Sequence, residues 1–299
     1  MNDPAFVRFA AAHPESAWRS ALWQVAGLQL HVVDGGPVDG PPVLLLHGFP
    51  EFWWGWRRQL PALAAAGWRV VAPDLPGYNL SAKPKGLAPY GLDRLSDVVR
   101  GLIDALGVTS LPVVGHDWGG AVAWWSALRF PERIARLAIL NVPHPAAFRQ
   151  ALRRDPEQRR RSRYMAYFQL PWLPERKLRQ ADFRPFRSIF RRTSRPGTFD
   201  EAELAAYAAA AAHPGALTAM LNWYRAALWR PPRRPAHTRV EPPVKILWGA
   251  EDLALGRRLV GASALRCRTV EVHWIESAGH WVQHEAVAEV NRSLLDFLA

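Results

Sequence analysis

The chain has 299 residues and 49% of them are hydrophobic, so it can bury a large core without disulfides or a structural metal. Its apolar stretches are far shorter than the roughly 20 residues that cross a bilayer, and residues 1–20 lack the apolar run of a signal peptide. Its one cysteine, Cys267, cannot build a disulfide framework. We therefore expect a cytoplasmic protein without membrane insertion.

The net charge of +12 is concentrated in one segment. Residues 149–195 contain fifteen Arg or Lys and four Asp or Glu. Basic surfaces of this kind can bind nucleic acid or anionic lipid, but no helix-turn-helix, zinc-finger or RRM pattern accompanies this one. We expect a solvated helix face and no nucleic-acid partner. If the basic surface does bind such a partner, the alternative hypothesis is a basic, non-catalytic binding protein and not an enzyme.

Short apolar runs alternate with segments of helical spacing through the first 145 residues. Buried strands are predicted at residues 42–46, 68–72, 111–114 and 134–140, and helices at residues 53–66, 92–106 and 118–130. Strands that alternate with helices of this length are typical of a mostly parallel sheet covered by helices on both faces. The predicted fold class is therefore α/β.

The pattern changes between residues 146 and 237, where Arg, Ala and aromatic residues dominate and no convincing strand occurs. We expect about four helices in this segment. Strands resume at residues 244–248 and 270–275, and an amphipathic helix at residues 282–298 ends the chain. The prediction is a core formed by residues 1–145 and 238–299, with residues 146–237 inserted as a helical cap, or lid.

The strand at residues 111–114 leads directly into Gly115-His116-Asp117-Trp118-Gly119-Gly120, after which a helix begins. A strand, a sharp turn and a helix form the context of a nucleophile elbow, whose usual pattern is G-x-S-x-G. Here Asp117 replaces the serine. The positive end of the helix dipole favours a carboxylate at this position, which helps to keep it ionised for attack. An N-cap aspartate would be the purely structural explanation.

The change from serine to aspartate predicts a different reaction. A serine that displaced at an alkyl carbon would form an ether, which water cannot readily cleave. A carboxylate that displaces at an alkyl carbon forms an ester, which water can cleave at its carbonyl group. Asp117 therefore favours attack on saturated carbon, as in an epoxide or an alkyl halide.

Cleavage of such an ester requires a base and a group that orients it. In this type of fold the expected order along the chain is nucleophile, acid, histidine. Asp252 follows the strand at residues 244–248, and His280 follows the last strand, 28 residues later. We predict His280 as the base and Asp252 as its partner, with Glu251 as the alternative partner.

The ester also needs two N–H donors for its developing oxyanion. The backbone of Trp118 is one candidate and that of Phe49 the other, because Pro50 has no N–H. His47, Pro50, Trp118 and Trp281 flank these groups and are predicted to contact the substrate, although His47 is expected to act mainly as a structural hydrogen-bonding residue. No metal site and no cofactor is predicted.

Taken together, these motifs resemble those of the epoxide hydrolases of the α/β-hydrolase fold. The matching strings are His47-Gly48-Phe49-Pro50-Glu51, Trp56-Arg57, Asp74-Leu75-Pro76-Gly77-Tyr78, Gly115 to Gly120 and Asn141-Val142-Pro143-His144-Pro145. They extend over most of residues 42–145. One departure is Asn79, where the family usually has glycine, and asparagine tolerates a positive φ best among the other residues.

The resemblance also implies two cap tyrosines that hold the epoxide oxygen. Tyr224, in Leu221-Asn222-Trp223-Tyr224-Arg225, and Tyr164 match the family at these positions, with Tyr167 as the alternative to Tyr164. Haloalkane dehalogenases share the aspartate elbow but usually carry Asn or Glu at the position of Phe49. Fluoroacetate dehalogenases usually carry Arg at the position of Trp118.

The sequence therefore predicts an epoxide hydrolase. Asp117 opens the ring of a small-molecule epoxide, and water activated by His280 and Asp252 cleaves the ester. The hydroxyls of the resulting vicinal diol come from the epoxide and from water. A haloalkane or haloacid dehalogenase is the alternative. A monomer or homodimer is expected.

Overall fold

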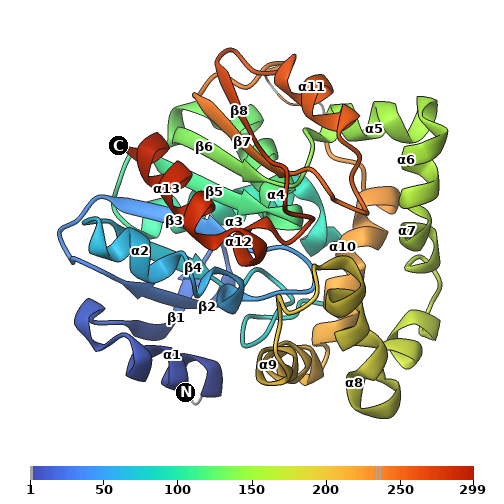
Figure 1. The fold of residues 1–299 in the computed structure, drawn as a ribbon, viewed down its shortest axis with the longest axis horizontal. Coiled ribbons are helices and arrows are strands. Elements are labelled where there is room, and N and C mark those ends of the chain that lie inside the picture. Colours follow the sequence, from blue (N-terminus) through green and yellow to red (C-terminus); the bar gives the residue numbers. More distant parts are fainter. Residues whose placement is uncertain (1–2, 234, 236) are drawn as a thin grey trace.

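The centre of the computed structural model, which describes residues 3–233, 235 and 237–299, is an eight-stranded sheet (Figure 1). The strands lie in the order β1-β2-β4-β3-β5-β6-β7-β8. Their bounds are Arg19–Val25 (β1), Leu28–Gly35 (β2), Pro42–Leu46 (β3), Arg69–Pro73 (β4), Leu111–His116 (β5), Ile134–Leu140 (β6), Val244–Gly249 (β7) and Val270–Ile275 (β8). From β4 to β8 every pairing is parallel, which confirms the predicted α/β class.

Two strands at the antiparallel edge have no counterpart in the sequence prediction. β1 pairs with β2, and β2 pairs with β4, each in antiparallel register. β1 is largely exposed, with only Val25 buried, so its sequence lacks the continuous apolar run of a strand that is covered on both faces. Such a half-solvated strand is difficult to detect when apolar runs are the main signal. β2 is largely buried, but His31 and Asp34 interrupt its apolar run.

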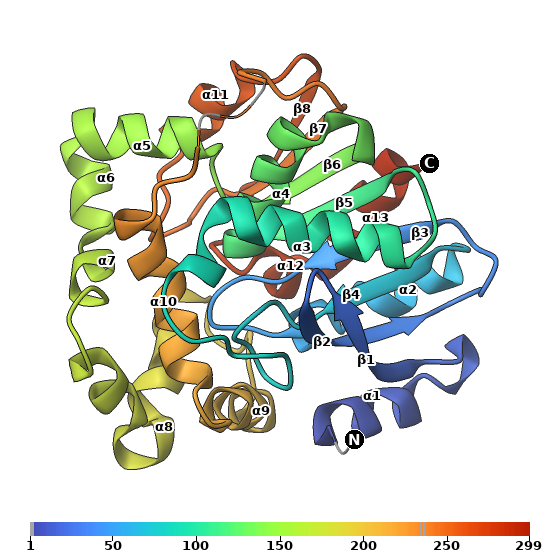
Figure 2. The same cartoon turned by 180° about the vertical axis from the view of Figure 1, so that it is seen from behind.

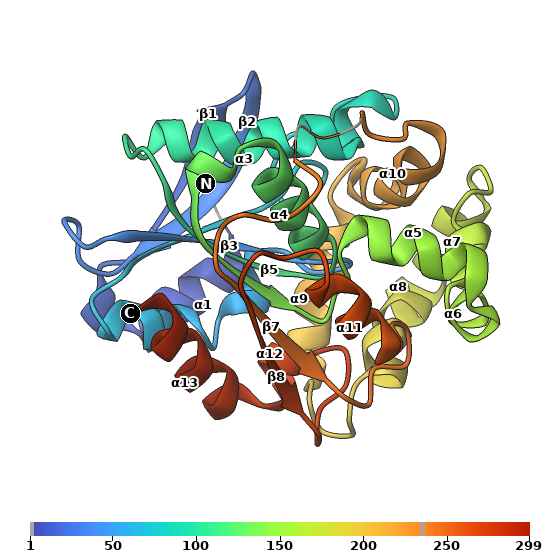
Figure 3. The same cartoon turned by 90° about the horizontal axis from the view of Figure 1, so that it is seen from above.

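Helices cover both faces of the sheet (Figures 1 and 2). On one side lie α3 and α4, and on the other α2, α12 and α13, as the view from above makes clear (Figure 3). The core helices are α1 (Pro4–Ala12), α2 (Leu60–Ala65), α3 (Leu92–Ala105), α4 (Asp117–Arg129), α11 (Arg258–Ala264), α12 (Val282–Glu285) and α13 (Val287–Leu298). Short 3₁₀ turns occupy Pro14–Ser16, Trp53–Trp56, Ala88–Tyr90 and Pro131–Arg133.

Two predicted helices are each divided in the structure. Residues 53–66 form the 3₁₀ turn Trp53–Trp56 and then α2, which starts near Pro61, a residue suited to the first turn of a helix. The predicted helix at residues 282–298 breaks at Ala286, whose φ of −131° and ψ of 52° are not helical. In contrast, α3 is continuous, and it buries an apolar stripe with helical spacing: Leu95, Val98, Val99, Leu102 and Ile103.

In the described part of the inserted segment, six helices lie between β6 and β7, more than the about four expected (Figure 1). They are α5 (Pro145–Arg154), α6 (Pro156–Arg161), α7 (Arg163–Tyr167), α8 (Leu173–Thr193), α9 (Glu201–Ala212) and α10 (Ala216–Trp229). There are more helices than expected because the first part of the segment is divided into three short ones, α5, α6 and α7. The division between α5 and α6 is marked by Asp155, whose side chain caps the start of α6. The proposed end of the cap at residue 237 adjoins residues 234 and 236, which lie outside the described residues.

Within the described ranges, no single helix is long and apolar enough to cross a membrane. Among the described helices, the pair α9 and α10 meets that test of length and composition, but with an 81° bend between the two helices.

Candidate active site

Asp117 stands at the junction between β5 and α4, at the carboxyl end of a central strand. Its φ of 47° lies in the left-handed region, a conformation that costs a non-glycine residue about 1–3 kcal/mol and is common at functional sites. The turn is tight, because a Cβ at Gly119 would collide with the carbonyl oxygens of Leu46 and His47. Glycine is therefore required where the elbow packs against the end of β3.

The carboxylate of Asp117 faces one backbone donor and one imidazole. Its Oδ1 accepts a hydrogen bond of 2.8 Å from the N–H of Phe49, the residue predicted to supply an oxyanion donor. Its Oδ2 lies 3.6 Å from Nε2 of His280. The N–H of Trp118 belongs to the first turn of α4, where backbone donors have no partner within the helix. The side chain of Asp117 is only 14% exposed, so its charge is poorly screened by water.

His280 is held by Asp252, which leaves its other ring nitrogen directed at Asp117. Nδ1 of His280 lies 2.8 Å from Oδ2 of Asp252, so Nδ1–H donates to the carboxylate. Burial lowers the pKa of His280, but the carboxylates of Asp252 and Asp117 outweigh it and raise the pKa to about 9. The alternative acid, Glu251, is exposed.

Asp252 is fixed by hydrogen bonds on both of its oxygens. Oδ1 accepts from the backbone N–H groups of Ala254 and Leu255, at 2.7 and 2.9 Å. Oδ2 accepts from the side-chain amide of Asn141 at 2.8 Å as well as from His280. Burial would raise the pKa of Asp252, but these partners, His280 above all, lower it. The carboxylate therefore stays ionised and cannot turn away from the imidazole.

Asn141 is a site residue for which no role was predicted from the sequence. It follows β6 directly, with a φ of 45°, and its Oδ1 accepts a hydrogen bond of 2.8 Å from the N–H of Gly249 at the end of β7. It thus connects the ends of two adjacent parallel strands while it holds Asp252. The signal that could have found it was the polar residue immediately after a buried strand, since ligands and catalytic groups collect at the carboxyl ends of parallel strands.

Tyr224 of α10 lies among aromatic rings directly over the elbow. Its ring centroid is 5.1 Å from those of Phe49 and Trp118, 5.0 Å from that of Phe168 and 5.9 Å from that of Tyr164, all in edge-to-face geometry. Only 4% of Tyr224 is exposed. Burial raises the pKa of its hydroxyl well above the ordinary value, with a further contribution from Asp117 among others, so the hydroxyl keeps its proton at neutral pH.

Tyr164 of α7 lies beside Tyr224 and at the edge of the solvent. Its side chain is 37% exposed, and its ring also contacts Phe168, at 5.7 Å. Burial of its hydroxyl end and the negative charges of Asp117 and Asp252 raise the pKa of Tyr164. Tyr167, the alternative, contacts Phe168 with ring centroids 6.1 Å apart. The contact of Tyr164 with Tyr224 favours Tyr164 as the first tyrosine, which stays a prediction.

The remaining predicted contact residues surround these groups. Both ring nitrogens of His47 are engaged: Nδ1 donates to the carbonyl of Gly48, and Nε2 accepts from the N–H of Leu75, each at 3.0 Å. Trp281 is buried, and its Nε1–H donates to Thr193 of α8 at 2.9 Å, which connects core and cap. Pro50 is buried next to Phe49. Contact of these side chains with a substrate remains a prediction.

Asn79, the departure from the expected turn, has a φ of 41° and so adopts the conformation that glycine would favour. Its side-chain amide donates to Asp74 at 2.8 Å, which stabilises the turn. Within the described residues, no group of three or more His, Cys, Asp or Glu side chains is arranged to hold a metal ion.

Residues 41–287 match the alpha/beta hydrolase fold family, so the chain belongs to that family. It is 42% identical to the AB hydrolase superfamily protein YfhM of Bacillus subtilis, over 91% of this chain and 95% of the relative. It is 35% identical to Epoxide hydrolase 2 of Caenorhabditis elegans, over 98% of this chain and 84% of the relative. A crystal structure of an epoxide hydrolase from Bacillus megaterium superposes with a TM-score of 0.84 at 31% identity, over 93% of this chain and 99% of that one. Within the family, the chain thus belongs with the epoxide hydrolases.

Proposed function

We propose that this protein converts small-molecule epoxides to vicinal diols through a covalent ester on Asp117. The observation that carries the proposal is a carboxylate in the elbow that faces the His280–Asp252 pair, with the ring of Tyr224 packed against Phe49 and Trp118 beside it. The likeness to proteins named epoxide hydrolases supports the same substrate class.

In the first step, Asp117 attacks one ring carbon and the C–O bond of the epoxide breaks. The departing oxygen becomes an alkoxide unless a proton donor is present. The hydroxyls of Tyr224 and Tyr164 serve this role, because burial keeps both protonated at neutral pH. Acid assistance of this kind typically contributes about 10²–10⁴-fold.

In the second step, the ester is hydrolysed. Ester formation removes the negative charge of Asp117, which is one of the charges that raise the pKa of His280. The imidazolium then gives up its proton, which restores the tyrosine hydroxyl that protonated the epoxide oxygen. The neutral imidazole can take a proton from water, while Asp252 stabilises the resulting imidazolium. Water attacks the carbonyl carbon of the ester, the N–H groups of Phe49 and Trp118 hold the oxyanion, and the diol leaves with the proton that His280 returns.

This two-step route makes a prediction about the oxygen atoms. Water attacks the carbonyl carbon of Asp117 and not the substrate, so the oxygen from water remains in the carboxylate after the first turnover and enters a diol only in a later one. In a single turnover in ¹⁸O-labelled water, mass spectrometry of the peptide that contains Asp117 should detect the label. A label in the diol and none in the peptide would show direct attack of water on the epoxide and would contradict the covalent mechanism.

A further inference from the structure

A cluster of exposed apolar side chains lies where α7 is joined to α8, at the outer edge of the cap (Figures 1 and 2). We call residues 163–179, which contain this cluster, the cap tip. Trp172 of the tip is 69% exposed. Its neighbours in the chain include three more exposed side chains with large apolar surfaces: Tyr167, Leu170 and Leu173. Contiguous apolar exposure that is rimmed by polar residues commonly marks an interaction site.

The backbone of the cap tip is held in place from the inside of the cap. Arg225 of α10 donates to the carbonyl oxygens of Phe168, at 3.0 Å, and Leu170, at 2.7 Å. The same guanidinium forms an ion pair of 2.7 Å with the buried carboxylate of Glu175. Trp172 has a φ of 47°, which is rare for a bulky residue. The exposed ring is therefore presented to solvent by a fixed segment of backbone.

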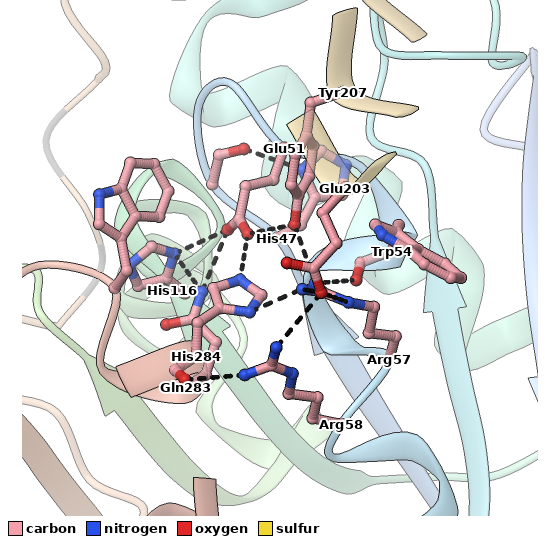
Figure 4. Close-up of polar contacts among 12 residues, drawn as sticks. His47, Glu51, Trp54, Arg57, Arg58, His116, Glu203, Tyr207, Gln283 and His284 are labelled. Atoms are coloured by element: carbon pink, nitrogen blue, oxygen red, sulfur yellow. Dashed lines mark hydrogen bonds and ion pairs between the residues drawn. The ribbon is translucent and has the colours of Figure 1, made fainter. Parts of the chain in front are cut away.

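The cap is joined to the core through a different part of its surface (Figure 4). Arg57 of the core forms an ion pair with Glu203 of α9. Tyr207, also in α9, donates a hydrogen bond of 3.2 Å to the buried carboxylate of Glu51 in the core. The exposed face of the cap tip is thus not the surface by which the cap is attached.

The exposed charge around the apolar cluster is positive. Lys177 lies one helical turn after Leu173, so the two side chains share a face of α8. The other exposed cations of the tip are Arg163, Arg176 and Arg179. Glu175 is the one acidic residue between residues 158 and 181, and its charge is buried against Arg225. An apolar centre with a cationic rim is the result.

We propose that the cap tip docks on the surface of an anionic lipid bilayer. Trp172, Leu170 and Leu173 enter the headgroup region, and the cations around them contact lipid phosphates. Tryptophan and tyrosine are enriched at membrane interfaces, and Lys and Arg side chains reach from an apolar region to the charged headgroups. Such adsorption buries apolar groups by about 5–10 Å and needs no helix that crosses the bilayer. This binding goes beyond the proposed function, because no part of it depends on the reaction.

The pattern of charge favours lipid over a second copy of the chain or a nucleic acid. A symmetric dimer through the cap tip would place the cations of one copy against the same cations of the other, which is unfavourable. Single-stranded nucleic acid binds to cations and to aromatic rings on which its bases stack, whereas Leu170 and Leu173 offer no such ring. An anionic bilayer accommodates both the aliphatic side chains and the cations.

Docking through the cap tip would bring one side of the candidate active site to the lipid surface. Tyr164 belongs to the tip, and its ring centroid lies 5.9 Å from that of Tyr224. Tyr167, one turn later in α7, belongs to the exposed cluster. The same short helix therefore contributes to the site and to the docking surface.

The test is co-sedimentation of the full chain with vesicles of phosphatidylcholine, with or without added phosphatidylglycerol. We expect the wild type to bind the anionic vesicles at least about 10-fold more tightly than the neutral ones. Trp172→Asn removes the apolar ring, and asparagine tolerates the positive φ at this position. This variant should bind the anionic vesicles about 10-fold more weakly than the wild type.

Trp229→Asn is the matched control for the apolar contact. Trp229, at the end of α10, is 66% exposed, close to the value for Trp172. It lines a surface hollow of mixed charge that includes Asp93 and Asp97. This variant should bind anionic vesicles as the wild type does. Its melting temperature and that of Trp172→Asn should both stay near the wild-type value, since both side chains are exposed.

The charges of the tip need their own control, because a chain with a net charge of +12 is attracted to any anionic surface. The double variant Arg176→Gln/Lys177→Gln removes two cations from the tip. The double variant Arg153→Gln/Arg154→Gln removes two exposed cations from α5, at the other end of the cap (Figure 1). We expect the first to weaken binding by about 10-fold or more and the second by less than about threefold.

A wild type that does not bind anionic vesicles would overturn the proposal. Equal weakening in Trp172→Asn and Trp229→Asn, or in the two double variants, would also overturn it, because any exposed ring or any charge would then suffice. Wild-type dimers that dissociate in Trp172→Asn, without vesicle binding, would assign the tip to a second copy. Binding of oligodeoxythymidine that Trp172→Asn weakens, without vesicle binding, would assign it to nucleic acid. Diol formation enters none of these readouts, so failure of the proposed function is seen separately.

Discussion

Nε2 of His280 lies 3.6 Å from Oδ2 of Asp117, whereas Nδ1 of the same ring is held 2.8 Å from Asp252. The two carboxylates differ in how firmly they are held. Asp252 accepts four hydrogen bonds, from His280, Asn141, Ala254 and Leu255. Asp117 accepts one backbone hydrogen bond, from Phe49, and its Oδ2 faces the imidazole. This difference matches an orienting role for Asp252 and a nucleophilic role for Asp117.

Asp117→Asn should reduce diol formation by at least about 10³-fold, because an amide is a poor nucleophile at saturated carbon. Diol produced from styrene oxide is measured by chromatography. Freshly purified protein is needed, and its intact mass must exclude deamidation back to aspartate. A melting temperature close to that of the wild type shows that the fold is retained. Diol formation near the wild-type rate in the verified Asp117→Asn variant would rule out Asp117 as the nucleophile.

His280→Gln should allow the ester to form and prevent its hydrolysis. After a pulse of styrene oxide, the intact protein should gain the mass of one epoxide, and the adduct should map to the peptide that contains Asp117. Asp117→Asn treated in the same way is the control and should gain nothing. An active wild type combined with an unmodified His280→Gln protein would exclude the covalent route.

Tyr224→Phe and Tyr164→Phe should each slow ring opening by about 10- to 100-fold, because each removes one of two donors to the epoxide oxygen. Tyr167→Phe is the matched control and should remain near the wild-type rate. Steady-state diol formation provides the measurement. If Tyr167→Phe lost more diol formation than Tyr164→Phe, Tyr167 and not Tyr164 would be the donor to the epoxide oxygen. Halide release from a bromoalkane without diol from any epoxide would instead favour a dehalogenase.

The ionisation of His280 should make stability depend on pH. The pKa of His280 is raised from 6.5 in the unfolded chain to about 9 in the folded protein, so its contribution is fully present below about pH 6.5 and is lost as the pH rises through 9. Its magnitude is on the order of 3 kcal/mol. Urea unfolding of wild type and His280→Gln at pH 6 and pH 10 checks this. A stability difference that stays constant between these two values would contradict the raised pKa.

Asn141→Ala should lower the free energy of unfolding by about 2 kcal/mol, since it leaves the buried N–H of Gly249 without its partner and places alanine at a positive φ. It should also slow ester decay, because Asp252 loses one of its fixed donors. Urea unfolding and intact-mass kinetics measure the two effects. Asn291→Ala, which removes a side-chain hydrogen bond to Arg58 outside the site, is a control that should leave ester decay unchanged.

The sequence predicted well what local pattern determines. The predicted strands at residues 134–140 and 270–275 coincide with β6 and β8, because both are short segments rich in β-branched and large apolar residues between clear breaks. The elbow could be recognised because a buried strand, a helix and closely packed glycines must be consecutive in the chain. These features require no knowledge of which distant segments meet.

What the sequence could not provide depends on contacts between distant segments. Nothing in the local pattern around Glu51 shows that Tyr207, 156 residues later, would donate to it, or that His116 would reach the carbonyl of His280. The order of the cap helices around Tyr224 is also a result of packing, so Tyr164 and Tyr167 could not be distinguished from spacing alone. Asn141 was visible as part of a motif, but its partner Asp252 lies 111 residues away.

The insertion point of the cap has an evolutionary consequence. β6 and β7 are hydrogen-bonded neighbours in parallel register, so the chain leaves the sheet at the carboxyl end of β6 and must cross over to the amino end of β7. The closure cost of a long insertion in this crossover grows only slowly with its length. The cap can therefore be exchanged as a cassette, and the range of accepted molecules can diverge while ester cleavage is inherited unchanged. A transplanted cap would need counterparts of Tyr207 and Glu203, the residues through which α9 joins Glu51 and Arg57.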